Sequence, residues 1–101
     1  MTKVSMLGTI QCQPGKTAEM EAVLGQMVEA AREEPGTEVY SYHRGDNDTF
    51  WFFALMTDEA AMRSHGQGAA MKQAMEAFGP LMAAPPKMSV TTPVAAIGLN
   101  L

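Results

Sequence analysis

The sequence is poor in several kinds of residue, and each shortage excludes a class of protein. Cys12 is the only cysteine, so no disulfide can form within the chain, and the expected compartment is the cytoplasm. The 7 lysines and arginines never stand next to one another, and the net charge is −4, so the clustered basic charge that nucleic acids and anionic membranes require is missing. No apolar run approaches the roughly 20 residues of a membrane span, and the N-terminus lacks a signal-peptide core. We expect no nucleic-acid and no membrane partner.

Sequence motifs for cofactors and metals are missing as well. The chain contains no GxGxxG sequence, no Walker glycine loop and no GxSxG sequence. Its two histidines, His43 and His65, lie on different expected elements and lack, together with Cys12, the spacing of metal ligands. The sequence therefore predicts neither a metal site nor a bound cofactor.

What the sequence does contain is a succession of strands and amphipathic helices over 101 residues, the length of one domain. Residues 3–12 alternate as a strand does. A helix of about four to five turns follows, with Thr17 as its expected N-cap and Pro35-Gly36 after its end. Asp58 is expected to cap a short helix from Glu59 to His65 that Gly66 ends, before a second helix and a last strand near residues 88–92.

This order of elements is the split βαβ plan. It predicts a ferredoxin-like α+β fold with a four-stranded antiparallel sheet, in a single domain that spans residues 1–101.

The central part of the chain, residues 37–44 and 49–57, reads as a β-hairpin around the turn at residues 45–48. If these four residues form the loop, Tyr42 pairs with Trp51 and Tyr40 pairs with Phe53. One face of the hairpin would then carry these four aromatic residues, and the other face would carry Val39, Ser41, His43, Phe50, Phe52 and Met56. Because both faces are apolar, both must be covered. Helices can cover one face, and a second copy of the sheet would cover the other, which predicts a homodimer.

Two groups of residues are candidates for a functional site. His65 stands at the end of its short helix, where it either caps helix carbonyls or serves as a general base for an acidic substrate hydroxyl. Tyr40, Tyr42 and Trp51 form an aromatic patch that either packs in the core or forms a stacking wall for an aromatic ligand. The 10 methionines either fill gaps in the core or provide an adaptable lining for a flat, apolar ligand.

Several of these features together resemble the antibiotic biosynthesis monooxygenase family. The shared features are Pro35-Gly36, Tyr40 four residues on, the aromatic strand from Phe50 to Phe53 and the short helix that ends in His65. The family pattern has a glutamate eleven residues before the histidine and a tryptophan two residues after that glutamate. This chain has Ala54 and Met56 there. Haem-degrading relatives carry a tryptophan and a histidine where this chain has His65 and Met75, so haem degradation is not expected.

The resemblance implies a dimeric α/β barrel with a pocket in each subunit between sheet and helices. It also implies oxidation of a quinol or an aromatic polyketide by O2 without a cofactor. His65 would then accept or share the substrate proton, and Tyr40 and Tyr42 would orient substrate oxygens. Trp51 and Phe53 would stack against the aromatic ring if their face of the hairpin lines the pocket, and the sequence leaves open which face does. Two alternatives stay open, a non-catalytic dimeric barrel that binds an apolar or aromatic small molecule, and an isomerase or decarboxylase of a small metabolite on the same fold.

Overall fold

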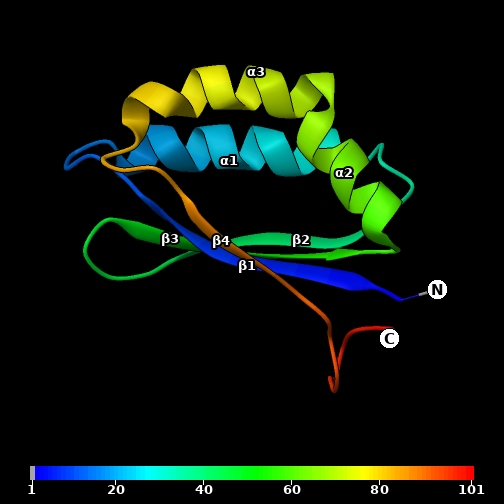
Figure 1. Cartoon of the computed structure of the whole chain (residues 1–101). Coiled ribbons are helices and arrows are strands. Elements are labelled where there is room, and N and C mark those ends of the chain that lie inside the picture. The colour runs from blue at the N-terminus through cyan, green and yellow to red at the C-terminus, as the bar shows by residue number, and fades with distance from the viewer. Residues whose placement is uncertain (1) are drawn as a thin grey trace.

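The computed structural model describes residues 2–101 and contains the elements that the sequence predicts, in the predicted order (Figure 1). These are β1 (Val4–Gln11), α1 (Thr17–Ala31), β2 (Thr37–Arg44), β3 (Thr49–Met56), α2 (Glu59–Gln67), α3 (Ala69–Phe78), the short 3₁₀ helix η1 (Gly79–Leu81) and β4 (Lys87–Thr91). The strands form one antiparallel sheet in the order β2-β3-β1-β4. The predicted ferredoxin-like α+β fold is confirmed.

The helices and the sheet form two layers, because α1, α2 and α3 all lie over the same face of the sheet (Figure 1). The chain after β4 runs to the opposite side, where the Asn100 carbonyl accepts a hydrogen bond from the Lys3 ammonium. The core between the layers is built from Ile10, Met20, Leu24, Phe50 and Phe78, all nearly or fully buried. One sheet face is therefore covered by helices, and we call the other the open face.

The helix ends differ in detail from the prediction. Thr17 is the first residue of α1 rather than its N-cap, because the Met20 amide donates to the Lys16 carbonyl and so closes the first turn one residue earlier than expected. The Asp58 cap is confirmed, since its carboxylate accepts a hydrogen bond of 2.8 Å from the Ala61 amide. Helix α2 runs through Gly66 to Gln67. None of the helices within residues 2–101 is long and apolar enough to cross a bilayer.

The hairpin between β2 and β3 has a register that differs from the prediction by one residue. Tyr42 pairs with Phe52 and Tyr40 with Ala54, so the predicted partners Trp51 and Phe53 are wrong. The reason lies in the loop, where the Gly45 amide donates to the Thr49 carbonyl at 2.8 Å and places Gly45 opposite Thr49. The loop proper is therefore residues 46–48, and two of its residues have a left-handed backbone, with φ of 57° at both Asn47 and Asp48.

A slip of one residue moves side chains to the other face of a sheet. Phe50, Phe52 and Met56 consequently lie on the helix-covered face with the two tyrosines, and not opposite them as predicted. Trp51 and Phe53 lie on the open face with Ser41 and His43. The expectation that both faces of the hairpin are apolar holds with this exchange, since an aromatic group still lies on each face.

Candidate functional site

A cavity of about 570 Å³ lies between the covered face of the sheet and the helices. Six of the 10 methionines line it, namely Met6, Met27, Met62, Met71, Met75 and Met88. The polar side chains in its wall come from Tyr40, Tyr42, His65, Arg63 and Gln67. The cavity is thus mainly apolar with a few polar groups, which is the usual composition of a site for a small organic molecule. Met6 and Met27 also belong to the buried core, so these methionines both fill the core and line the cavity.

His65 is the most buried polar group in the cavity wall, with 5% of its surface exposed. Its Nδ1 lies 2.7 Å from Oε1 of Glu34, which belongs to the turn between α1 and β2. The same carboxylate oxygen accepts a hydrogen bond of 2.7 Å from the Thr37 hydroxyl. The alternative in which the imidazole caps helix carbonyls does not describe this structure, because Nδ1 bonds to a side chain from a different element.

The second ring nitrogen of His65 faces the cavity. Within residues 2–101, Nε2 has no hydrogen-bond partner in the protein, and no buried side-chain nitrogen or oxygen is left without one. Nε2 is therefore reached from the cavity that the ring lines. Of the two ring nitrogens, Nε2 is the one left for a ligand hydroxyl in the cavity.

Tyr40 and Tyr42 add two hydroxyl groups beside the imidazole. The Tyr40 ring stands edge-on to the His65 ring, with centroids 4.9 Å apart and an angle of 88°. The two hydroxyl oxygens lie 2.5 Å apart and share one hydrogen bond, in which either can be the donor. One of the two O–H hydrogens is thus left for another acceptor, and the sulfur of Met27 lies 4.0 Å from the Tyr42 oxygen.

The ionisation of these tyrosines is suppressed. Burial raises the pKa of the Tyr40 phenol well above its ordinary value of about 10, and the nearby Tyr42 raises it further. Burial also raises the pKa of Tyr42, although the hydrogen bond to Tyr40 opposes this effect. Both hydroxyls therefore keep their hydrogens at neutral pH. Together they have one hydrogen left to donate to a ligand oxygen.

A close contact between the turn after α1 and helix α2 brings His65 to Glu34. Gly36 lies so near to α2 that a Cβ atom at this position would stand 2.4 Å from the Cβ of Ala61. The Thr57 amide donates to the Gly36 carbonyl at 2.9 Å just before α2 begins. Only glycine fits here, and its use places the start of α2 directly against the turn that carries Glu34.

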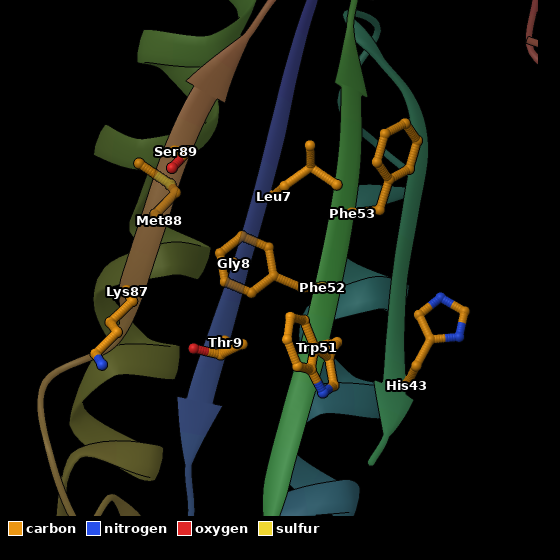
Figure 2. Close-up of a pocket in the computed structure, with 10 residues that line it drawn as sticks. All are labelled: Leu7, Gly8, Thr9, His43, Trp51, Phe52, Phe53, Lys87, Met88 and Ser89. Carbon is orange, nitrogen blue, oxygen red and sulfur yellow. The ribbon is translucent and has the colours of Figure 1, made fainter.

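The structure separates the residues that the sequence groups into one site. Tyr40, Tyr42 and His65 are brought together in the cavity, but Trp51 and Phe53 lie on the open face of the sheet. There they border a second hollow of about 570 Å³, in which Figure 2 shows Trp51 beside Thr9, and Phe53 beside Leu7, on the neighbouring strand. A ligand in the cavity can therefore contact the two tyrosines but cannot stack on Trp51 or Phe53.

Glu34 is the residue of the site that sequence reasoning misses. It is 31 residues away from His65 and matches no motif spacing, so the sequence carries no signal for the pair. At the position where the family pattern has its glutamate, Ala54 is fully buried between its strand partners Tyr40 and Met6. No group of three or more histidine, cysteine, aspartate or glutamate side chains within the described part of the chain could hold a metal ion.

Comparisons with known proteins agree with the fold. The family model described as antibiotic biosynthesis monooxygenase matches residues 4–77. A Caulobacter crescentus structure, provisionally described as such a monooxygenase, is 28% identical with a TM-score of 0.89, over 93% of this chain and 92% of that one. A Nitrosomonas europaea protein of unknown function is 25% identical with a TM-score of 0.87, over 99% and 97% of the two chains.

A curated relative, an uncharacterised protein from Synechocystis, is 27% identical over 89 residues, which is 86% of this chain. The chain spans 60% of the length of that relative.

Proposed function

This chain belongs to the antibiotic biosynthesis monooxygenase family, and we propose that it oxidises a phenolic aromatic molecule, of the quinol or aromatic polyketide type, with O2 and without a cofactor. The observation that carries the proposal is the imidazole of His65, whose Nε2 faces an apolar cavity next to two neutral tyrosine hydroxyls. A phenol fits this arrangement because it offers a flat apolar ring and one acidic hydroxyl.

The reaction needs an electron-rich substrate, since the substrate itself must reduce O2. His65 Nε2 takes the proton of the substrate hydroxyl, and the resulting phenolate gives one electron to O2. The phenoxyl radical and superoxide combine at a ring carbon that carries hydrogen, and the returned proton converts the peroxide to a hydroperoxide. Loss of water leaves a carbonyl group at that carbon. The overall change is phenol plus O2 to quinone plus water, so one oxygen atom enters the product and the other leaves as water.

The side chains around the cavity support these steps in two ways. Tyr40 and Tyr42 remain neutral and can donate a hydrogen bond to a substrate oxygen, which holds the ring in one orientation. The methionine and aromatic walls keep water away from the radical pair, which would otherwise release superoxide. Proton transfer from a hydroxyl to a positioned histidine contributes roughly 10²- to 10⁴-fold in enzymes generally.

We further propose that the chain works as a homodimer that forms through the open face. Proteins of this family are typically dimeric. On the open face Leu7 is 45% exposed and Trp51 is 56% exposed, and Phe53 is the register partner of Leu7, two residues along β3 from Trp51. A second copy of the same face would remove these apolar groups from water. Trp51 and Phe53 thereby take a role in assembly, in place of the ligand stacking that the sequence suggests.

Oxygen uptake by metal-free protein tests the proposed activity. A panel of hydroquinones and phenolic anthrones should include substrates whose oxidation consumes one O2 per molecule. With heavy-isotope-labelled O2, the quinone should carry one labelled oxygen atom. The His65→Ala variant serves as the control for oxidation that occurs in solution. Equal rates with the unmodified chain and with the variant would refute His65 as the proton acceptor.

A protein that only binds an aromatic molecule is the second candidate. It is favoured by Ala54, which leaves the strand position of the family glutamate without a carboxylate. In that case the same phenols should quench the fluorescence of the protein on binding, and no labelled oxygen should enter them.

A further inference from the structure

We propose that Glu34 is a positioning residue, which fixes the imidazole of His65 with its hydrogen on Nδ1 and its lone pair on Nε2. This role rests on the proposed function, because it explains how His65 is ready to accept a proton from a substrate hydroxyl. Nothing in the family pattern points to Glu34, and the role follows from the contacts of this chain alone.

The first step of the argument is the direction of the hydrogen bond. A carboxylate has no hydrogen to donate, so in the 2.7 Å contact between His65 Nδ1 and Glu34 Oε1 the ring nitrogen must be the donor. A neutral imidazole carries only one N–H group. With that hydrogen on Nδ1, the nitrogen that remains as an acceptor is Nε2, which is the one that faces the cavity.

The second step concerns the charge that forms during the reaction. When Nε2 takes a proton, the ring becomes an imidazolium. This cation would be almost fully buried, since only 5% of the His65 surface is exposed. A buried cation is costly unless an opposite charge lies close to it. Glu34 supplies that charge without moving, and its own side chain is 29% exposed and remains hydrated on its outer side. A pair of this kind can therefore accept and return a proton.

The third step is that Glu34 itself is held in place. The Thr37 hydroxyl donates to the same Oε1 at 2.7 Å, and the Thr37 amide donates to the Glu34 carbonyl at 3.3 Å. Because the Gly36 contact holds α2 against this turn, the carboxylate and the imidazole are each fixed by their own element. An arrangement of carboxylate, histidine and substrate hydroxyl follows, in which the carboxylate sets the tautomer and never touches the substrate.

The tautomer of His65 can be measured without any substrate. Long-range proton–nitrogen NMR spectra of the nitrogen-15-labelled full chain distinguish Nδ1–H from Nε2–H rings, and the chain has only two histidines to assign. We expect His65 as the Nδ1–H form, and we expect Glu34→Ala to shift it towards Nε2–H, the form that free histidine prefers. Glu33→Ala is the matched control, since it removes an exposed carboxylate from the adjacent position. His43, on the open face, should be unchanged in both variants.

Turnover provides the second measurement. If the proposed oxidation is observed, Glu34→Ala should lower kcat roughly 10- to 100-fold and leave KM almost unchanged, while Glu33→Ala leaves both unchanged. Glu34→Asp, which keeps the charge, should recover part of the loss.

The outcomes separate the two proposals. A chain that oxidises no phenol, but whose His65 tautomer depends on Glu34, would refute the proposed function and leave the positioning role intact. A His65 that is already the Nε2–H form in the unmodified chain would overturn the positioning role, and this result needs no variant to fold. A Glu34→Ala variant with an unchanged tautomer would overturn it as well.

Discussion

The two faces of the sheet are built from the same strands, yet they differ in what they offer to other molecules. The covered face presents Tyr40 and Tyr42 to a cavity under the helices, where the buried His65 is hydrogen-bonded to the Glu34 carboxylate. The open face presents Leu7, Trp51 and Phe53 with no helix over them. Adjacent residues such as Phe52 and Trp51 therefore lie on different faces, because side chains alternate along a strand.

This difference teaches that aromatic residues in a strand cannot be assigned to one site by their proximity in sequence. The proposed chemistry needs polar groups in a mainly apolar cavity, which the covered face provides. Assembly needs exposed apolar area, which Leu7 and Trp51 provide on the open face. Variants that affect one face and leave the other intact test the division directly.

The largest expected effect is on the covered face. His65→Ala removes the proton acceptor, so turnover of a hydroquinone should fall by roughly 10²-fold or more. The dimer should persist, because His65 does not reach the open face. Steady-state oxygen uptake and analytical ultracentrifugation check the two parts. Full activity in a folded His65→Ala dimer would show that the protein merely binds a phenolate that forms in solution.

A substitution on the open face should affect the dimer instead of turnover. Trp51→Glu places a charge in the centre of the proposed interface, and loss of a central aromatic contact typically costs 2 kcal/mol or more, which corresponds to about a 30-fold weaker dimer. Sedimentation at micromolar concentration should show dissociation into chains of 10.9 kDa. A stable monomer already in the unmodified chain would contradict the assembly through this face, and the His65→Ala dimer is the matched control.

A smaller effect is expected where α2 meets the turn that carries Glu34. In Gly36→Ala the new Cβ would lie 2.4 Å from that of Ala61, so α2 must shift, at a cost of about 1–3 kcal/mol in the free energy of unfolding. Gly25→Ala is the control, because nothing lies within 4 Å of a Cβ at that exposed helix position. The control should raise stability by roughly 0.5–1 kcal/mol. Urea unfolding compares the two, and a tolerated Gly36→Ala would show that the contact adapts easily.

The smallest effect appears only at high pH. Because burial on the covered face raises the pKa of both Tyr40 and Tyr42 above the value of about 10 in an unfolded chain, the folded state keeps protons that the unfolded state loses. Their contribution to stability is complete below pH 10 and declines as the pH rises beyond it. Tyrosinate absorbance should therefore appear together with unfolding, followed by circular dichroism. Two tyrosines that ionise near pH 10 in a folded protein would show that water reaches their hydroxyl groups on the covered face.

The order and approximate bounds of the elements follow from the sequence alone. Alternating and helical periods of apolar residues identify the strands and helices, and Asp58 marks the start of α2, because these signals are local and depend on the nearest neighbours. The expectation that the hairpin has an apolar face without helices over it also follows from a local signal, the alternation of apolar residues along the strands. His65, Tyr40 and Tyr42 are predicted as candidate site residues from the sequence too, because of their residue types and their places on the expected helix and strand.

The register of the hairpin and the partner of His65 were decided by the tertiary structure. Whether Gly45 belongs to the loop depends on the left-handed conformations of Asn47 and Asp48, and a difference of one residue exchanges the two faces. The contact between Glu34 and His65 joins residues far apart in the chain, and it exists because Gly36 lets α2 approach the turn after α1. The sequence by itself determined which residues form strands and helices and which side chains could take part in a site. The packing of α2 against the turn after α1 determined which of these side chains meet, because the 2.7 Å contact of His65 with Glu34 joins residues whose spacing in the sequence carries no signal.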